Sequence, residues 1–331
     1  MRRTCILLNL FILCMMLSGC GEHAPNPSTP EGIRREETLL TVDGRDVTAG
    51  EYLYWLTTIC RGLEEQYAAA GKIVDWESPA EEGTLVDYVK NQALRSVALY
   101  ATVENWAERC GCAITEEDRA QLTEQWRKKA ESCGGEQVYL DRLAERGLDR
   151  TGAERMAEDH CLYGKLCALA GTEASPLYAA DYELKAYFET MQYLTMRVLK
   201  FTGEDAASRA AEAFVRLNGA VDTAAEFDAL GAGAAETYLP GAGVLPRSAF
   251  DAAAELGAGQ VSGILEIAEE TYAILLRTED DLDAVRLPHL DHRLQTAADG
   301  ADILVTEAYE KLDVIQLQET VLEVTKSEDR A

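Results

Sequence analysis

Histidine is scarce in this 331-residue chain: there are only four, and none lies between residues 161 and 288. A Ser-His-Asp triad needs a histidine as its general base, and the chain has no G-x-S-x-G segment, so a nucleophilic hydrolase is disfavoured. Basic residues are also few, 31 against 58 acidic ones, which gives a net charge of −27. Nucleic acid repels a chain of this charge, and no basic stripe offsets the repulsion.

Long apolar runs are missing after residue 17, where no stretch reaches the roughly 20 residues that cross a bilayer as a helix. The earlier run over residues 6–17 is also too short, and it follows Arg2 and Arg3, as in a signal peptide. The segment Leu17-Ser-Gly-Cys20 resembles the lipobox of exported lipoproteins. This resemblance implies cleavage before Cys20, acylation of its sulfur and a lipid anchor on the outer face of a membrane.

Cysteine usage leaves the redox state open. Six cysteines follow Cys20: Cys60, Cys110, Cys112, Cys133, Cys161 and Cys167. An even number permits three disulfides without fixing the pairing, and small buried apolar residues are the alternative. The Cys110-Gly-Cys112 segment has no second ligand pair at zinc-site spacing, so we expect neither a metal nor another cofactor.

The pattern of elements predicts an α+β protein with a mostly helical body and a smaller inserted α+β domain. The expected segments are a signal peptide over 1–19, the lipidated cysteine and a proline-containing tether over 20–37, a helical domain over 38–189, the inserted domain over 190–280, and a C-terminal helical segment over 281–331 that packs on the helical domain.

In the helical domain, Asp43-Gly44 between two short strand-like runs predicts a β-hairpin over 38–47. Thr48 with Glu51 forms a capping box, and apolar residues then recur at helical spacing. Similar pairs predict further helix starts at Thr84, Thr115 and Thr151. Four aromatic residues are expected in the core: Tyr52, Trp55, Tyr100 and Trp106.

In the inserted domain, the pattern predicts a strand over 194–201, helices over 204–218, 224–230 and 250–256, and a strand pair over 261–267 and 272–277. A final helix is expected over 301–322.

Several of these segments resemble the PrsA/SurA group of extracytoplasmic foldases, which carry a parvulin peptidyl-prolyl isomerase domain in a helical chaperone body. The motifs run in family order: Val42-Asp43-Gly44 through Tyr52, residues 114–118, Gly147-Leu148, residues 195–199, Phe227, residues 250–262 and residues 271–275. Each motif is short, and their order and spacing over nearly the whole mature chain carry the resemblance.

Two departures bear on catalysis. Active parvulins have a histidine in the first strand and another in the last strand, and Arg197 and Ala273 stand at these positions here. The family's double-glycine loop is reduced to Gly241-Ala-Gly243. The resemblance therefore implies weak or absent turnover and no catalytic residue. Leu245, Phe250 and Tyr272 are candidates for an apolar substrate-binding pocket, with ordinary core packing as the alternative.

The resulting hypothesis is an extracytoplasmic, lipid-anchored foldase or chaperone that binds unfolded or proline-containing secreted polypeptides through apolar grooves. An active prolyl isomerase is the alternative. A solute receptor of a transport system is a more remote one, because the first half lacks the repeated strand–helix alternation of such receptors.

Overall fold

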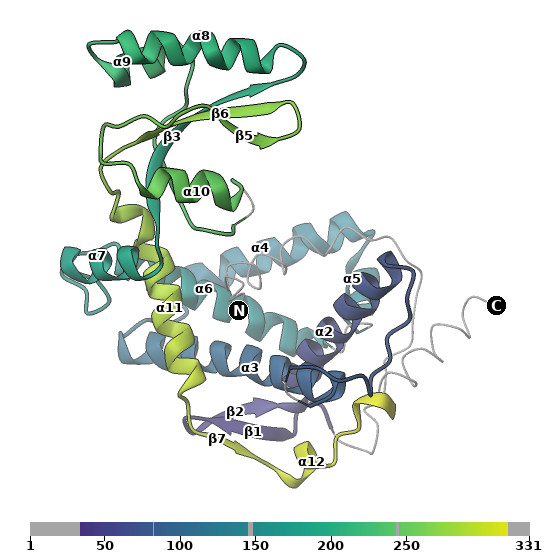
Figure 1. Ribbon diagram of the computed structural model, residues 1–331. Coiled ribbons are helices and arrows are strands. Elements are labelled where there is room, and N and C mark those ends of the chain that lie inside the picture. Colours follow the sequence, from purple (N-terminus) through teal and green to yellow (C-terminus); the bar gives the residue numbers. More distant parts are fainter. Residues whose placement is uncertain (1–33, 82, 145–147, 243–244, 317–331) are drawn as a thin grey trace. The chain divides into compact units, whose positions relative to one another are not determined.

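The computed structural model describes residues 34–81, 83–144, 148–242 and 245–316, which fall into two units (Figure 1). The second unit is Tyr178–His289, and the first combines the described residues on either side of it. The second unit thus contains the whole predicted 190–280 domain and extends beyond both of its ends. The signal sequence, Cys20 and the tether up to residue 33 lie outside the described residues. No helix among the described residues is long and apolar enough to cross a membrane.

The first unit starts with the predicted hairpin, formed by β1 (Thr38–Val42) and β2 (Arg45–Thr48). Asp43 and Gly44 both have positive φ, 49° and 79°, as a two-residue type I′ turn requires. The helices that follow are α2 (Ala49–Ala69), α3 (Leu85–Arg109), α4 (Glu116–Cys133), α5 (Glu136–Ala144) and α6 (Arg150–Ala170).

Three of the four predicted helix starts are confirmed. Thr48, Thr84 and Thr115 are N-caps, each in a reciprocal capping box with the acidic residue three positions later. The start at Thr151 is wrong, because Asp149 caps α6 instead and its carboxylate accepts the amide of Gly152 at 2.7 Å. Glu154 is engaged elsewhere, in an ion pair with Arg150 at 2.8 Å.

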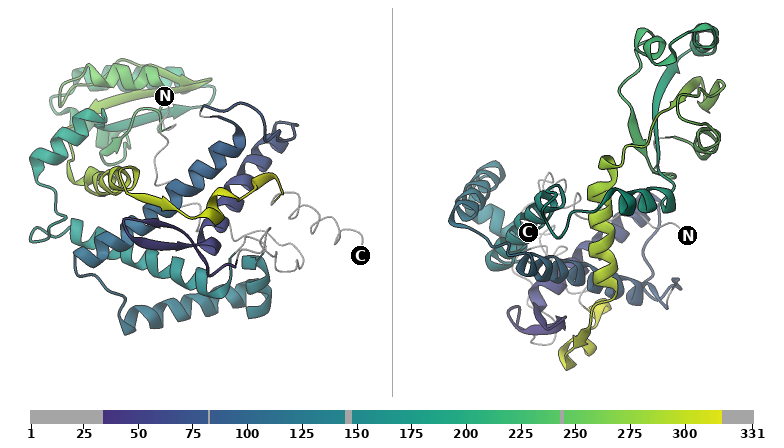
Figure 2. Two further views of the ribbon diagram at one scale, coloured as in Figure 1. Left: turned by 90° about the horizontal axis from the view of Figure 1, so that it is seen from below. Right: turned by 90° about the vertical axis from the view of Figure 1, so that its left-hand side faces the viewer.

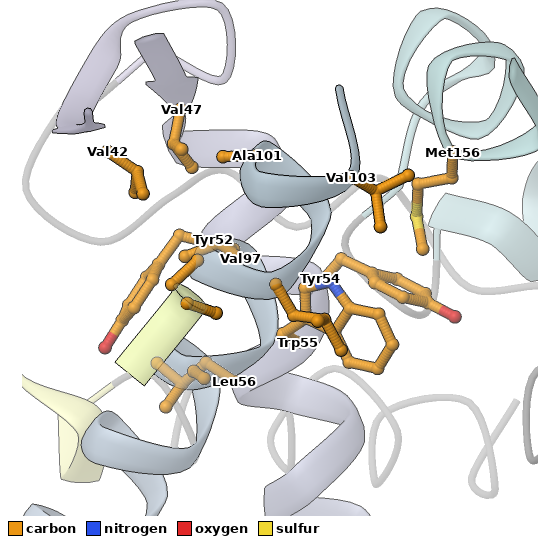
Figure 3. Packing of buried hydrophobic residues seen from close by; sticks show 14 of the residues in the cluster. Val42, Val47, Tyr52, Tyr54, Trp55, Leu56, Val97, Ala101, Val103 and Met156 are labelled. Carbon is orange, nitrogen blue, oxygen red and sulfur yellow. The ribbon is translucent and has the colours of Figure 1, made fainter. Parts of the chain in front are cut away.

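The core of the first unit lies between the three-stranded sheet and helices α2, α3 and α6. Figure 3 shows Trp55 and Leu56 of α2 beside Val97 of α3 within this core. Tyr52 is fully buried, and its hydroxyl donates to the backbone carbonyl of Lys90 at 3.2 Å, so its one polar atom is satisfied. Of the predicted core aromatics, Tyr52 and Trp55 are buried, and Tyr100 and Trp106 are half-buried against the same cluster.

The C-terminal part of the chain returns to this core after the second unit. Helix α11 (Arg286–Asp299) contributes Leu290, Leu294 and Ala298 to it, and Leu312 and Val314 follow. The helix predicted over 301–322 is wrong for the described part of that range. Strand β7 (Ile303–Val305) and the short helix α12 (Glu307–Glu310) stand there instead.

Pairing with β1 explains why residues 303–305 form a strand and not part of a helix. β7 pairs antiparallel with β1, with Leu40 opposite Val305, so the sheet order is β2-β1-β7. Figures 1 and 2 show β7, in yellow, running beside β1, in purple. The free hydrogen-bonding edge of the buried β1 selects an extended conformation for the Ile-Leu-Val run, which local helical periodicity does not reveal.

The second unit is a four-stranded antiparallel sheet of order β4-β3-β6-β5 with helices on both faces (Figure 1). Its strands are β3 (Leu194–Thr202), β4 (Glu236–Tyr238), β5 (Leu265–Ala268) and β6 (Thr271–Arg277). Its helices are α7 (Asp181–Thr190), α8 (Ala206–Gly219), α9 (Thr223–Ala229), α10 (Arg247–Ala254) and the 3-10 turn η2 (Asp283–Val285), before α11 begins. The predicted α+β class and the predicted elements of this domain are confirmed, with ends shifted by a few residues.

All six cysteines beyond Cys20 lie in the first unit, and within the described residues none of them forms a disulfide. Cys60 is buried in the core, and the other five are half-buried. Burial is also the main cause that raises the pKa of Cys110, Cys161 and Cys167. These thiols are therefore poor nucleophiles at neutral pH.

The cap at Thr48 gives a test of how the hairpin is joined to α2. Thr48→Ala removes the hydroxyl that accepts the Glu51 amide at 3.3 Å, so we expect the free energy of unfolding to fall by about 1 kcal/mol. Chemical denaturation followed by tryptophan fluorescence isolates this effect, because all four tryptophans lie in the first unit. Thr123→Ala, in the exposed middle of α4, is the matched control and should not destabilise. An equal loss in both variants would contradict a stabilising cap.

Candidate functional site

The sheet of the second unit has two differently packed faces. Because successive side chains of a strand point to opposite faces, β3 and β6 divide their residues between them. Met196, Ala273 and Leu275 pack with α10 on one face, and we call this the α10 face. Leu199, Ile274 and Leu276 pack with Phe227 and α8 on the other, the α8 face.

Arg197 lies on the α8 face, opposite Leu276 in the strand register. Its guanidinium lies 5.8 Å from the ring centre of Phe227. The Nε donates to the carbonyl of Gly233 at 2.8 Å, and the Nη atoms reach the carbonyl of Ala224 and the carboxylate of Asp228. Arg197 thus ties α9 and the loop after it to the sheet.

Ala273 lies on the α10 face, where it is fully buried with Leu245 and Phe250 in one apolar cluster. Tyr272 is its neighbour on β6, opposite Phe201, and therefore faces the α8 side. The structure brings Leu245, Phe250 and Ala273 together and places Arg197 and Tyr272 on the opposite face.

The residues on the α10 face are buried, which decides whether they line an open pocket or belong to the core. Leu245 is 7% exposed and Phe250 is 4% exposed, so both side chains are packed as core residues. Ala273 has no polar atom in its side chain, and Arg197 lies across the sheet from it. Arg197 and Ala273 therefore do not line one shared pocket.

A second group of polar residues lies in the first unit, and none of its members was predicted as a site residue. Arg155 of α6 directs its Nε to Glu51 of α2 at 2.9 Å and to Glu104 of α3 at 3.2 Å. Glu104 also accepts from Arg45 of β2 at 3.0 Å. The carboxylates of Glu51 and Glu104 are only 14% and 11% exposed, so the pairs are screened less than surface ion pairs.

Asp159 completes this group one turn after Arg155 on α6. It is 5% exposed, and it is hydrogen-bonded to the carboxyl group of Glu104. Burial, followed by the negative charge of Glu104, raises the pKa of Asp159 to about 9. Asp159 therefore carries a proton at neutral pH, which lets two neighbouring carboxyl groups share one hydrogen bond.

The spacing of residues along α3 indicates that Glu104 lies on a buried face of the helix. Val97 and Ala101 are buried, and Glu104 continues the same helical face. A carboxylate on an apolar stripe needs a partner, and the i,i+4 pair Arg155 and Asp159 supplies it from α6. The partner helix itself cannot be read from spacing, because the contact joins residues about fifty positions apart in the sequence.

The buried carboxyl group predicts a pH-dependent stability. Because the pKa of Asp159 is raised in the folded chain, folding binds a proton between pH 4 and pH 9, and the free energy of unfolding falls as the pH rises through that window. Asp159→Asn keeps the hydrogen bond to Glu104 and removes the titration. We expect it to stabilise the first unit at pH 8 by at least about 1 kcal/mol and to flatten the pH dependence.

Tryptophan fluorescence during denaturation between pH 5 and pH 9 measures this change. Glu212→Gln, an exposed carboxylate of α8 in the second unit, is the matched control. A variant chain that is less stable than the parent at pH 8, with the parent's pH slope, would show that Asp159 is ionised in the fold.

The bonds of Arg197 give a test in the second unit. Lysine presents a point charge and cannot bridge carbonyls around a fixed fork, so Arg197→Lys should lower the free energy of unfolding by about 2 kcal/mol. Calorimetry should show this loss while the tryptophan fluorescence transition stays unchanged. Arg216→Lys, at a half-exposed ion pair between α8 and α9, is the control and should have little effect. If Arg197→Lys were as stable as the parent chain, the hydrogen bonds of Arg197 would not stabilise the second unit.

Among the comparisons with known proteins, only the one with solved structures finds similar proteins. No family model matches the chain, and no curated protein matches it. Among solved structures, it is similar to the foldase protein PrsA from Lactococcus lactis, at 14% identity and a TM-score of 0.33, over 85% of this chain and 98% of that one. PrsA from Streptococcus pneumoniae gives 16% identity and a TM-score of 0.27, over 78% and 93% of the two chains.

A SurA-like chaperone from Campylobacter jejuni gives 10% identity and a TM-score of 0.21, over 82% of this chain and 99% of that one. These proteins belong to the group that the sequence motifs resemble. What the present chain binds is therefore inferred from its own residues.

Proposed function

We propose that this chain is a lipid-anchored extracytoplasmic foldase or chaperone whose isomerase-like unit has lost most of its catalytic activity. The observation that carries the proposal is the family-like order of motifs combined with an arginine and an alanine at the two histidine positions.

The groups present at the two positions support the proposed loss of turnover. Prolyl isomerisation crosses a barrier of about 18–20 kcal/mol, which a catalyst lowers by favouring the twisted amide over the planar one. A pair of facing imidazoles contributes to a hydrogen-bond network around that amide. The guanidinium of Arg197 is committed to the carbonyls of Ala224 and Gly233, and the methyl group of Ala273 is fully buried. Neither position offers a group that could orient a bound proline peptide.

Client binding requires apolar surface that is open to an extended chain. Strand β7 is at the edge of its sheet and exposes Leu304 by 63% and Val305 by 41%. An edge strand with exposed apolar side chains can add a further strand from a client through main-chain hydrogen bonds. Such contacts depend little on the client's amino-acid sequence, so they are suited to weak binding of many unfolded polypeptides.

The membrane anchor is the acylated Cys20 of the proposed lipoprotein signal. The chain carries a net charge of −27, so an anionic membrane surface repels its body. The acyl chains then supply the attachment, and the tether separates the folded units from the membrane. Clients are secreted polypeptides that emerge unfolded at the outer face.

An aggregation assay tests the proposal. We expect the purified full-length chain in detergent to suppress aggregation of a chemically denatured client at a few-fold molar excess, relative to detergent alone. The same preparation should not accelerate isomerisation of a proline-containing peptide. Unchanged client aggregation would contradict the proposed chaperone function. Clear acceleration of isomerisation would show that the chain is an active isomerase.

A Leu304→Glu, Val305→Glu double variant places charge on the β7 edge, and its suppression of aggregation should be reduced severalfold. Val215→Glu, Val221→Glu is the matched control, because both valines are exposed and lie in and just after α8, in the other unit. An equal effect of the two double variants would exclude β7 as the client-binding edge.

A further inference from the structure

Two cysteines from distant parts of the sequence lie near the same ammonium group in the first unit. Cys112 is in the loop between α3 and α4, and Cys161 is on α6, which packs against both of these helices (Figure 1). The ammonium group of Lys165 interacts electrostatically with both thiols. Because this interaction weakens with distance, the two cysteine side chains lie around one point of the fold.

The carboxylate of Asp118 holds this arrangement together. It accepts from the backbone amide of Thr115 at 2.7 Å, in the cap of α4, and it pairs with the Nζ of Lys165 at 2.7 Å. The thiol of Cys161 is hydrogen-bonded to the same carboxylate. Since Thr115 follows Cys112 by only three positions, the start of α4 and the loop before it are fixed to α6 beside Cys161.

The sulfur of Cys112 lies beside open space. Cys112 lines a depression of about 370 Å³, together with Ile114 of the same loop and Glu158 and Leu162 of α6. Residues 158, 161, 162 and 165 share one face of α6, because residues three and four positions apart are neighbours on a helix. Cys112 therefore borders the helix face that carries Cys161, and a small molecule in the depression has access to its sulfur.

Cys110, the cysteine nearest to Cys112 in sequence, has different surroundings. It is the C-cap of α3, and Gly111 after it has a φ of 71°, which ends the helix. Cys110 interacts with Arg293 of α11, whereas Cys112 interacts with Lys165 of α6. Cys110 and Cys112 also interact with each other, so a bond within the Cys-Gly-Cys segment is the competing outcome.

We propose that Cys112 and Cys161 are a redox pair, which forms a reversible disulfide when the folded chain meets an oxidising disulfide compound. The pairing is a property of the first unit and goes beyond the proposed function. Only the oxidising surroundings depend on the proposed location outside the cytoplasm. The bond closes the loop of residues 112–161 and links the α3–α4 connection to α6, which restricts the unfolded chain.

The reaction is a thiol–disulfide exchange in two steps. Cys112 loses its proton to solvent and attacks one sulfur of the oxidant, whose S–S bond breaks and whose first thiolate leaves and takes up a proton. Cys161 then leaves Asp118, loses its proton to solvent and attacks the Cys112 sulfur, which releases the second oxidant thiol. Two protein thiols are oxidised, and one oxidant disulfide is reduced to two thiols.

The order of the two steps follows from the surroundings of the thiols. Burial raises the pKa of Cys161, so its thiolate is scarce at neutral pH. Cys161 therefore takes the second step, in which its target is held beside it on the same chain and the reaction is intramolecular. Cys112, at the open depression, takes the step that needs a molecule from solution.

Peptide mapping of the full-length chain in detergent tests the redox pair. The folded chain is incubated with oxidised glutathione, its remaining thiols are alkylated, and it is digested with trypsin. Cleavage after Arg109, Arg119, Arg155 and Lys165 places Cys110 and Cys112 in peptide 110–119 and Cys161 in peptide 156–165. We expect these two peptides, joined by a disulfide, as the main oxidised product. A bond inside peptide 110–119 as the main product would overturn the proposal.

Serine variants identify the two sulfurs. Cys112→Ser and Cys161→Ser should each abolish the joined peptides, and Cys110→Ser should retain them. Cys133→Ser is the matched control, because Cys133 is another half-buried cysteine of the first unit and its sulfur accepts from Arg142 at 3.3 Å. Joined peptides that persist in Cys112→Ser, or disappear in Cys110→Ser, would assign the bond to Cys110 and overturn the pair.

Thermal unfolding followed by tryptophan fluorescence gives a second readout. Oxidation should raise the midpoint by at least about 5 °C relative to the chain in dithiothreitol, because the bond restricts the unfolded state. Cys161→Ser should show no such shift. Joined peptides that form only in denaturant, or an oxidised chain less stable than the reduced one, would show that the fold does not bring these sulfurs together.

The two proposals fail separately. The aggregation assay of the chaperone function is also run on the chain in dithiothreitol, where the disulfide is absent. Suppression of aggregation without joined peptides would leave the chaperone function without the redox pair. Joined peptides without suppression would leave the redox pair without the chaperone function.

Discussion

Four elements of the first unit meet at one guanidinium group, that of Arg155. It holds Glu51 of α2 and Glu104 of α3, and it donates to the backbone carbonyl of Asp46 in β2 at 3.3 Å. Glu51 also closes the cap at Thr48, so the start of α2 and the ion-pair network depend on the same carboxylate. Without the arginine, Glu51 and Glu104 would be two poorly solvated anions beside a third carboxyl group, and burying charges without a partner is strongly unfavourable. The packing of the hairpin against three helices depends on this node.

The second unit uses its arginine in a comparable way. Arg197 lies on the α8 face of the sheet, and its hydrogen bonds go to backbone carbonyls around α9. Four of the five N–H donors of this guanidinium form hydrogen bonds to α9 and the loop after it, so the side chain has a fixed position. The sheet therefore has a framework contact at that position, and its opposite face is filled by Phe250 and Ala273. The shape of the unit is kept by packing, independently of chemistry at a reaction centre.

Local signals in the sequence were sufficient for much of this architecture. The Asp43-Gly44 turn and the boxes at Thr48, Thr84 and Thr115 each involve atoms within a few residues, and all are present. The predicted start at Thr151 was wrong because Asp149, two positions earlier, caps α6 instead. β7 and the Arg155 cluster were out of reach for a different reason. Each is defined by a partner far away in the sequence, and neither periodicity nor composition records which segments meet.

The pairing of β1 with β7 orders the events by which the chain folds. Leu40 lies opposite Val305, and the whole second unit stands between them in the sequence. The sheet of residues 178–289 needs no strand from outside that segment, whereas one edge of β1 stays unpaired until residues 303–305 reach it. Leu39, Leu40 and Val42, all fully buried in the finished protein, belong to that waiting strand. A protein that we propose binds unfolded clients thus itself has an apolar strand with an unpaired edge until its C-terminal part folds.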